Sequence, residues 1–484
     1  MELILKSEKS LNRLDNLRAF LLSGKWMAFL SFISAIAITI THLFPGQDIE
    51  IKFTVVFAYI AAFCFAVCKD LFAVLYPLLC TYMVAIQCFD SFDKFMSIKW
   101  WLVPIFIPIL FHLVCYRKRL TTKGTQFVPM LLVSIAIILG GIGFISKEEY
   151  FSGTSIYHML GLGFGMVFIY SYFFAHIEKN ENYDITEMMT KIMVLTGALA
   201  SFMVVSFYIV NIEMVIESIA TRSVIYMQWR NNCSTILMLS IPFAFMLAHK
   251  KPFASVLGFV FYFAILLTGS RGGMVFGSIE IVMCVIMFIL YDKRRRVAYV
   301  IIGLCVIFGC LVFAPQLTEL LGSTIDRLFS AINGFLIGDK TEIRVRHYAQ
   351  GIQDFLGQPI FGTGLGYMGN RDIHASRKFA LCWYHCEPIQ IVASFGLVGA
   401  VTFTYQFIRR MMLLWRKSSL FNVTVFLSYI SLELMSLVNP GILCPVPYLL
   451  LIVIFMVVVE KNDEDRENGR LKISKEEKIE VKQR

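Results

Sequence analysis

Charged residues are scarce in this chain. Only 16% of its 484 residues are Asp, Glu, Lys or Arg, whereas 57% are hydrophobic and the mean hydropathy is +0.70. Soluble domains carry about 25% charged and about 45–50% apolar residues, so this composition excludes a soluble globular enzyme. In the alternative solvent, lipid, each backbone amide must be satisfied within its own segment, and the apolar stretches must therefore be helices.

Paired cysteines and metal-binding patterns are also missing. The 12 cysteines include no Cys-x-x-Cys pair, and most lie within apolar segments, where a free thiol behaves as a small buried hydrophobe. We therefore expect neither a disulfide framework nor a metal site. The net charge of +10 comes from basic residues dispersed beside apolar segments. This dispersal reflects membrane topology, and nucleic acid is not an expected partner.

About fourteen apolar segments approach the length of about 20 residues that a membrane span requires. The predicted fold class is an all-α polytopic membrane protein with about fourteen transmembrane helices, in a range of 12–14. The segments cover 26–44, 53–68, 71–88, 100–115, 127–145, 156–175, 191–210, 233–248, 253–268, 273–291, 298–314, 388–408, 421–438 and 445–459.

The distribution of Lys and Arg predicts the orientation. With the N-terminus in the cytoplasm, the inner loops hold 30 of the 44 basic residues, as the positive-inside rule requires. Both termini are then cytoplasmic in a multi-pass protein of the cytoplasmic membrane. The predicted parts are a cytoplasmic segment (1–25), eleven spans (26–314), a large extracytoplasmic loop (315–387), three spans (388–459) and a charged cytoplasmic tail (460–484).

The loop over 315–387 is far longer than any other connection, and long loops are usually functional or disordered. Its first part places apolar residues at helical spacing, which predicts an amphipathic helix lying in the membrane interface. A second short helix is expected from Arg344 to Leu356. A glycine-rich turn follows at Gly362 to Gly369.

Arg271 is the first candidate for chemistry. It stands in Ser270-Arg271-Gly272-Gly273, between two spans that leave almost no loop, so it lies at membrane depth on the outer face. An ionisable group in such a place is costly and is a functional candidate by default. The alternative is an arginine that snorkels from a tight turn.

Four further arginines lie in outer segments. Arg344 and Arg346 begin the second loop helix, and a guanidinium offers a planar fork of donors that suits phosphate oxygens. Residues two positions apart do not share a helical face, so only one of the two is expected to point at a site. Arg222 and Arg230 precede the eighth span, where each is either a ligand-binding residue or an interfacial anchor.

His385 ends the large loop immediately before the twelfth span. This position puts its imidazole at the outer membrane surface, where a neutral or charged ring can face a ligand. A lone histidine is more often structural.

Three motifs occur in a fixed order along the chain. They are Ser270-Arg271-Gly272-Gly273; Arg344-x-x-x-Tyr348 followed by Gln358-Pro359-Ile360-Phe361-Gly362-Thr363-Gly364-Leu365-Gly366; and His385-Cys386-Glu387-Pro388-Ile389-Gln390 followed by Phe395-Gly396-Leu397-Val398-Gly399. Together they resemble the O-antigen ligase and O-antigen polymerase superfamily of bacterial membrane glycosyltransferases. Cys386 replaces the usual Asn of that family, and Tyr348 stands where Trp is common.

The resemblance implies a GT-C-like enzyme whose donor is a polyprenyl-diphosphate-linked oligosaccharide. The glycan would pass to a sugar hydroxyl of an acceptor glycan outside the cytoplasmic membrane, without metal, nucleotide sugar or other cofactor. By position, Arg271 and Arg344 would bind the diphosphate and His385 would position or deprotonate the acceptor. Arg346, Arg230 and Arg222 are further candidates for diphosphate binding. The family also implies a chain-length co-polymerase as partner.

Three functions remain open at this point. Polymerisation of repeat units is the leading hypothesis, and ligation to a different acceptor is a variant that the sequence does not separate from it. A transporter or flippase of the same lipid-linked oligosaccharide is the alternative from another class, although the polar features here gather on one face. A non-catalytic scaffold would leave Arg271 and His385 unexplained.

Overall fold

The regular elements among the described residues are helices, and each predicted apolar segment contains at least one. The computed structural model describes residues 13–87, 99–120, 122, 124–141, 159–177, 183–223, 225, 227–337, 343–365, 384–416, 419–439 and 448–464. The helices are, in order, 13–21, α2 (Gly24–Leu43), α3 (Ile49–Val67), α4 (Phe72–Ala85), α6 (Lys99–Leu102), η2 (Val103–Ile105), α7 (Phe106–Cys115), α8 (Phe127–Gly141), η4 (Met159–Gly165), α10 (Met166–His176), α11 (Ile185–Val210), α12 (Ile212–Ala220), α13 (Arg230–Ala248), η5 (Pro252–Ala254), α14 (Ser255–Thr268), α15 (Arg271–Tyr291), α16 (Arg296–Val312), α17 (Ala314–Leu336), α18 (Ile343–Gly357), α19 (Glu387–Arg416), α20 (Leu420–Ser436) and 448–464.

The number of long helices is smaller than the number of apolar segments. Among the described residues, seven helices are long and apolar enough to cross a membrane, and an eighth is added if α16 and α17 form one bent span. Five further apolar helices have only 10–17 residues. The all-α, multi-pass class is therefore confirmed. The predicted number of about fourteen spans is larger because it includes the short apolar helices as well as the long ones.

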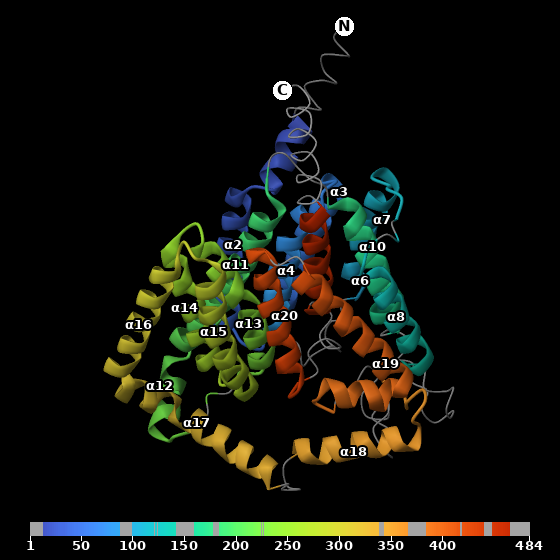
Figure 1. Ribbon diagram of the computed structural model, residues 1–484. Coiled ribbons are helices and arrows are strands. Elements are labelled where there is room, and N and C mark those ends of the chain that lie inside the picture. Colours follow the sequence, from blue (N-terminus) through green and yellow to red (C-terminus); the bar gives the residue numbers. More distant parts are fainter. Residues whose placement is uncertain are drawn as a thin grey trace, which may run out of the picture.

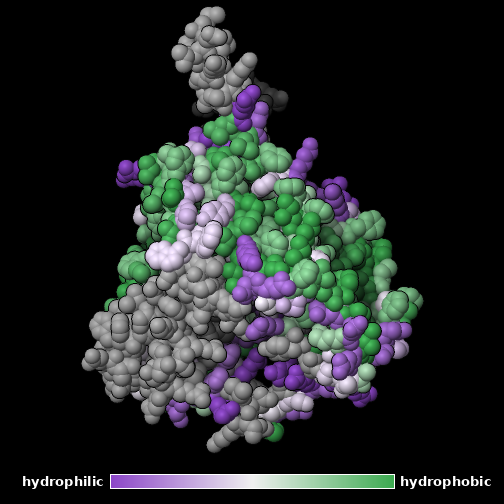
Figure 2. Space-filling model, turned by 180° about the vertical axis from the view of Figure 1, so that it is seen from behind, coloured by the Kyte–Doolittle hydropathy of each residue, from purple (hydrophilic) through white to green (hydrophobic). Residues whose placement is uncertain are grey.

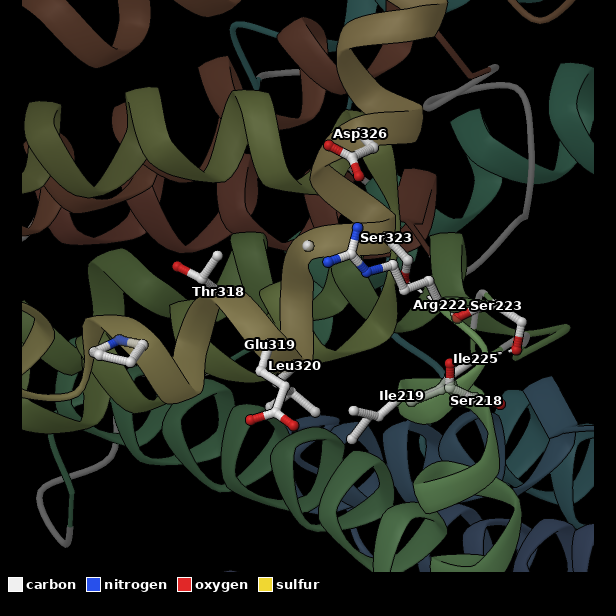
Figure 3. A pocket seen from close by; sticks show the side chains of 12 residues that line it. Ser218, Ile219, Arg222, Ser223, Ile225, Thr318, Glu319, Leu320, Ser323 and Asp326 are labelled. Carbon is white, nitrogen blue, oxygen red and sulfur yellow. Dashed lines mark hydrogen bonds between the residues drawn. The ribbon is translucent and has the colours of Figure 1, made fainter.

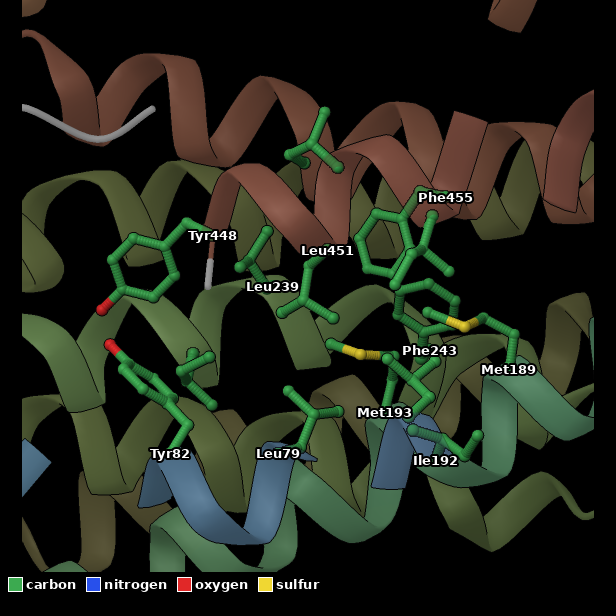
Figure 4. Close-up of a cluster of buried hydrophobic side chains, with 14 of the residues drawn as sticks. Leu79, Tyr82, Met189, Ile192, Met193, Leu239, Phe243, Tyr448, Leu451 and Phe455 are labelled. Atoms are coloured by element: carbon green, nitrogen blue, oxygen red, sulfur yellow. The ribbon is translucent and has the colours of Figure 1, made fainter. Parts of the chain in front are cut away.

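The centre of the bundle is α13, and 78% of its most apolar stretch is buried inside the protein. Figure 4 shows Leu239 and Phe243 of this helix beneath the helix over 448–464, with α4 and α11 packed from the other side. All the labelled side chains of this cluster are buried. Because lipid supplies no hydrophobic drive between helices, close van der Waals packing of this kind holds the bundle together.

The connecting segments gather at two opposite ends of the bundle (Figure 1). At one end lie the helix over 13–21 and the end of the helix over 448–464. There Arg18 Nε donates to the carbonyl of Val67 (2.9 Å), and the backbone N–H of Thr125 donates to the Glu460 carboxylate (2.9 Å). At the other end α17 and α18 run across the base of the molecule.

The outer surface of the bundle is apolar between these ends. On the face shown in Figure 2, green hydrophobic side chains fill the middle, and purple hydrophilic ones gather toward the lower edge. On α16, the side chains of Ile301, Leu304 and Phe308 are more than half exposed. Such a large apolar surface would be an aggregation hazard in water, and it suits contact with lipid.

Both helices expected in the large loop are present. The first, α17, bends away from α16 by 80°. Leu321 and Thr324 on one side of α17 are buried, whereas Glu319 and Asp326 on its other side are exposed. The second, α18, starts one residue before the predicted Arg344. The end of the predicted turn, 366–369, lies outside the described residues, as does most of the tail over 460–484.

The predicted span over 388–408 lies within α19, which is long and apolar enough to cross a membrane but is broken at Gly396 (φ 63°, ψ −155°). A broken helix leaves backbone donors and acceptors without partners, and here the loop over 359–364 supplies them. The hydrogen bonds run from Leu397 N to Pro359 O (2.8 Å), from Val398 N to Ile360 O (3.2 Å), from Thr363 N to Ala393 O (2.8 Å) and from Gly364 N to Ser394 O (3.0 Å).

We expect Gly396→Ala to destabilise the protein by about 1–3 kcal/mol or more. A side chain here would occupy the left-handed region, which costs about that amount, and its Cβ would lie 2.3 Å from the carbonyl oxygen of Ile360. The measurement is the apparent melting temperature in detergent. Gly303→Ala is the matched control, since a Cβ there meets nothing within 4 Å. Equal melting temperatures for the two variants would contradict the packing described at the break.

Candidate active site

Arg271 and Arg230 begin two neighbouring helices. Gly269 (φ 67°) ends α14, and the Ser270 hydroxyl then caps α15 by accepting the N–H of Gly273 (3.3 Å). The same hydroxyl donates to Oδ1 of Asn231 (2.9 Å) near the start of α13. Arg271 and Arg230 are therefore the first residues of adjacent helices, and both are partly buried. Helix N-termini carry partial positive charge, so this pair of ends favours an anion.

The end of α20 lies between this turn and the large loop. A Cβ at Gly272 would lie 2.7 Å from Cγ2 of Val438, so only glycine allows the turn to approach this closely. One residue earlier, the carbonyl of Leu437 accepts a hydrogen bond from the Tyr348 hydroxyl of α18 (3.2 Å). The same hydroxyl is 3.3 Å from the carbonyl of His385. The segment over 437–439 thus connects the Arg271 turn to α18 and His385.

His385 is held in a strained and mostly buried position. It has φ 55°, which is uncommon for a residue other than glycine and is a feature of functional sites. Its ring stacks on that of His347, with centroids 5.4 Å apart and planes within 10°. Arg344 lies near enough to influence its charge, and the Asn439 side chain hydrogen-bonds to it. Three segments of the chain therefore meet at this imidazole: its own, α18 and the residues after α20.

These surroundings determine the charge of His385. Burial, the Arg344 guanidinium and His347 lower the pKa of His385 from its ordinary 6.5 to about 4, and the hydrogen bond with Asn439 opposes the shift. The imidazole is therefore neutral at physiological pH. A neutral ring has one nitrogen that can accept a proton, so His385 is able to act as a general base.

A buried set of hydrogen bonds fixes α18 against α19 next to His385. The Tyr384 hydroxyl donates to the Asp354 carboxylate of α18 (2.6 Å), and its backbone N–H donates to Oε1 of Gln390 (3.0 Å). Gln390 in turn donates to the Ser394 hydroxyl (2.9 Å). Tyr384, Asp354 and Gln390 are all buried. Because these contacts flank His385 on both sides, they limit the movement of its backbone.

The predicted site residues lie in four places in the structure. Arg271 and Arg230 share the turn at α13 and α15, and Arg344 stands beside His385. Arg346, two residues along α18, is exposed, whereas Arg344 is partly buried, so Arg344 stays the stronger candidate of the two. Arg222 lies in a separate cavity between α12 and α17. The described residues hold no group of three or more His, Cys, Asp or Glu placed to bind a metal ion.

Sequence reasoning missed two residues next to His385. His347 follows Arg344 by three positions, so a shared helical face was the available signal. Asn439 had only a weak signal, since an asparagine after an apolar span is an ordinary helix end. Both were passed over because their partner, His385, is distant in sequence.

The structure defines a class: an all-helical, multi-pass membrane protein whose candidate catalytic groups meet at one end of the bundle. Residues 253–404 match the family model described as O-antigen ligase. The match contains Arg271, Arg344 and His385, and it confirms the resemblance found from the three motifs. The chain thus carries an O-antigen ligase domain and is a glycosyltransferase-type enzyme. The comparison with curated proteins found no match.

We expect Arg344→Gln to raise the pKa of His385 above 4, toward 6.5, because a nearby positive charge disfavours the imidazolium. The measurement is an NMR titration of protein labelled in the imidazole carbon, with the His385 signal assigned by its loss in His385→Gln. Arg346→Gln removes the same charge from the exposed face of α18 and serves as the control. An identical His385 titration in Arg344→Gln and the wild type would contradict the placement of Arg344.

Proposed function

We propose that this protein polymerises or ligates polysaccharide on the outer face of the cytoplasmic membrane. It transfers a glycan from a polyprenyl diphosphate carrier to a sugar hydroxyl of an acceptor glycan. The observation that carries the proposal is the Leu437–Asn439 segment, which packs against the turn that carries Arg271 and lies beside α18 and His385 with its neighbour Arg344. The orientation is supported by the Lys and Arg count, because the loops predicted to be cytoplasmic lie at the end opposite His385.

In the proposed reaction, the acceptor oxygen attacks the anomeric carbon of the donor sugar. The bond from that carbon to the diphosphate oxygen breaks, and the electron pair leaves with the lipid diphosphate. His385 accepts the proton of the acceptor hydroxyl, an effect worth about 10²–10⁴-fold in rate. The proton later passes to solvent, which restores the neutral imidazole.

The arginines stabilise the leaving group in this scheme. Charge-assisted, bidentate bonds between guanidinium and phosphate oxygens are among the strongest hydrogen bonds in proteins. Arg271 and Arg230 lie at two helix N-termini, so the helix ends add to their attraction for the diphosphate. Arg344 extends the positive charge to the His385 side. Preorganised charge of this kind lowers the barrier most when it faces the developing negative charge.

The flippase alternative has one structural feature in its favour, the broken helix α19, since many transporters use broken helices at their substrate sites. In this protein the loop over 359–364 closes the break with four backbone hydrogen bonds. The freed backbone groups are thus already occupied by the protein itself. We therefore favour the enzyme.

We expect purified protein in lipid vesicles to lengthen a lipid-linked oligosaccharide, or to move it to a second acceptor, without added nucleotide. His385→Ala and Arg271→Ala should each lower the rate by at least about 10²-fold, because each removes a group that acts in the transition state. Gel electrophoresis of the products gives the rate. Longer glycans on the carrier indicate a polymerase, and transfer to another acceptor indicates a ligase.

Arg119→Gln provides the control for loss of one positive charge. Arg119 is exposed and follows α7 in a segment at the opposite end of the bundle, so its removal should leave the rate unchanged. Undiminished elongation by both His385→Ala and Arg271→Ala would refute the proposed mechanism. Transport of the oligosaccharide across the vesicle without elongation would establish the flippase instead.

A further inference from the structure

A polar cavity lies at the same end of the molecule as His385 (Figure 1). It has a volume of about 420 Å³, which is within the range of about 300–1,000 Å³ that is usual for small-molecule sites. Its walls come from the end of α12, the residues after it and the first half of α17 (Figure 3). We call it the α12–α17 pocket.

Both signs of charge face this pocket. Arg222 reaches into it from the α12 side, and Glu319 and Asp326 lie on α17 (Figure 3). Among the described residues, Arg222 forms no ion pair with either carboxylate. The two carboxylates outnumber the guanidinium, so the pocket disfavours a diphosphate. The earlier assignment of Arg222 to diphosphate binding therefore does not fit its position.

The remaining lining combines hydroxyl groups with apolar side chains. Thr318, Ser223 and Ser323 offer hydroxyls, each of which can donate and accept, while Ile219 and Leu320 offer apolar surface. A sugar ring presents the complementary groups, with hydroxyls around its edge and C–H groups on its faces. Carboxylates accept from sugar hydroxyls and a guanidinium donates to them, so this lining can satisfy both roles of each hydroxyl.

The backbone around the pocket is fixed and strained at one point. Arg222 has φ 50°, an uncommon conformation that persists only where the surroundings enforce it. The Ser323 hydroxyl donates to the carbonyl of Ser223 (3.2 Å), which ties α17 to the segment after α12. The strain thus places a long cationic side chain at a cavity that the fold already holds open.

The pocket adjoins the turn that carries Arg271. A Cβ at Gly269 would lie 3.7 Å from the carbonyl of Ile225, a lining residue, and 3.9 Å from the Thr324 hydroxyl beside Ser323. His385 lies beyond the same turn, across the 437–439 segment. In the proposed reaction the acceptor hydroxyl approaches His385, so the acceptor occupies that side of the Arg271 turn. The pocket lies on the other side of the turn, where the sugars of the donor can bind.

We infer that the α12–α17 pocket binds uncharged or amino sugar residues of the lipid-linked donor glycan. The inference rests on the proposed function for the identity of the donor, while carbohydrate binding by the pocket can be measured without turnover. The observation that supports this inference is that Arg222, Glu319 and Asp326 line one pocket beside the Arg271 turn.

The test fills the pocket without disturbing its walls. Gly322 lines the cavity, and a Cβ there meets nothing within 4 Å, so Gly322→Phe projects into the open space. Gly309→Phe is the matched control, because a Cβ at Gly309 on α16 also meets nothing. The probes are the reducing oligosaccharide released by mild acid from the lipid-linked donor, and inorganic pyrophosphate. Binding of each to the full-length protein in detergent is measured by calorimetry.

We expect Gly322→Phe to weaken oligosaccharide binding at least tenfold and to leave pyrophosphate binding unchanged. Glu319→Gln with Asp326→Asn should weaken oligosaccharide binding while the cavity remains open. Unchanged oligosaccharide binding in Gly322→Phe, or loss of pyrophosphate binding alone, would overturn the inference. In the elongation assay, a higher KM for the lipid-linked donor supports it, and a higher KM for a free oligosaccharide acceptor alone refutes the donor assignment.

The binding and elongation results separate the two proposals. If the protein binds the oligosaccharide through this pocket but never lengthens it, the pocket stands and the proposed reaction fails. If elongation proceeds at the wild-type rate and with the wild-type KM in Gly322→Phe, the reaction stands and the pocket fails.

Discussion

The hydrogen bonds that close the break in α19 are the constraint on which the candidate site depends. A membrane-embedded backbone group without a partner costs several kcal/mol, so a helix can break at Gly396 only where another segment satisfies it. The loop over 359–364 does so. The helix that directly precedes this loop, α18, therefore packs against the first half of α19. His385 precedes that half-helix, and Arg344, His347 and Tyr348 lie on α18, so one backbone closure brings the loop residues to the imidazole.

The same positive charge serves two purposes at this imidazole. Arg344 lowers the pKa of His385, which keeps the ring neutral and able to accept a proton. It also attracts anions to the place where a diphosphate would leave. When such an anion binds, its charge offsets that of the guanidinium and the proton affinity of His385 rises. Under the proposed function, His385 would therefore become a stronger base when the donor is present.

Local signals in the sequence predicted the helices and indicated the candidate site residues, but they could not predict contacts between residues that are distant in the chain. Arg271 was identified because a charge between two apolar runs is rare. Gly396 gave no warning of a break, since one glycine in an apolar run is compatible with a span. Arg410 was counted with the inner loop, yet it is 2% exposed within α19, and its guanidinium contacts the hydroxyl of Tyr429 in α20 (3.5 Å). Counting charges cannot reveal a partner on another helix.

Under the proposed function, the substrate is anchored in the bilayer. Its lipid tail would hold the diphosphate at a fixed depth, so much of the translational freedom would be lost before the enzyme acts. The proposed reaction then requires charge only at that depth. Arg271 and Arg230 at their helix N-termini, Arg344 on α18 and the carboxylates of α17 all gather at that one end. The rest of the chain can be apolar packing that holds these groups in place.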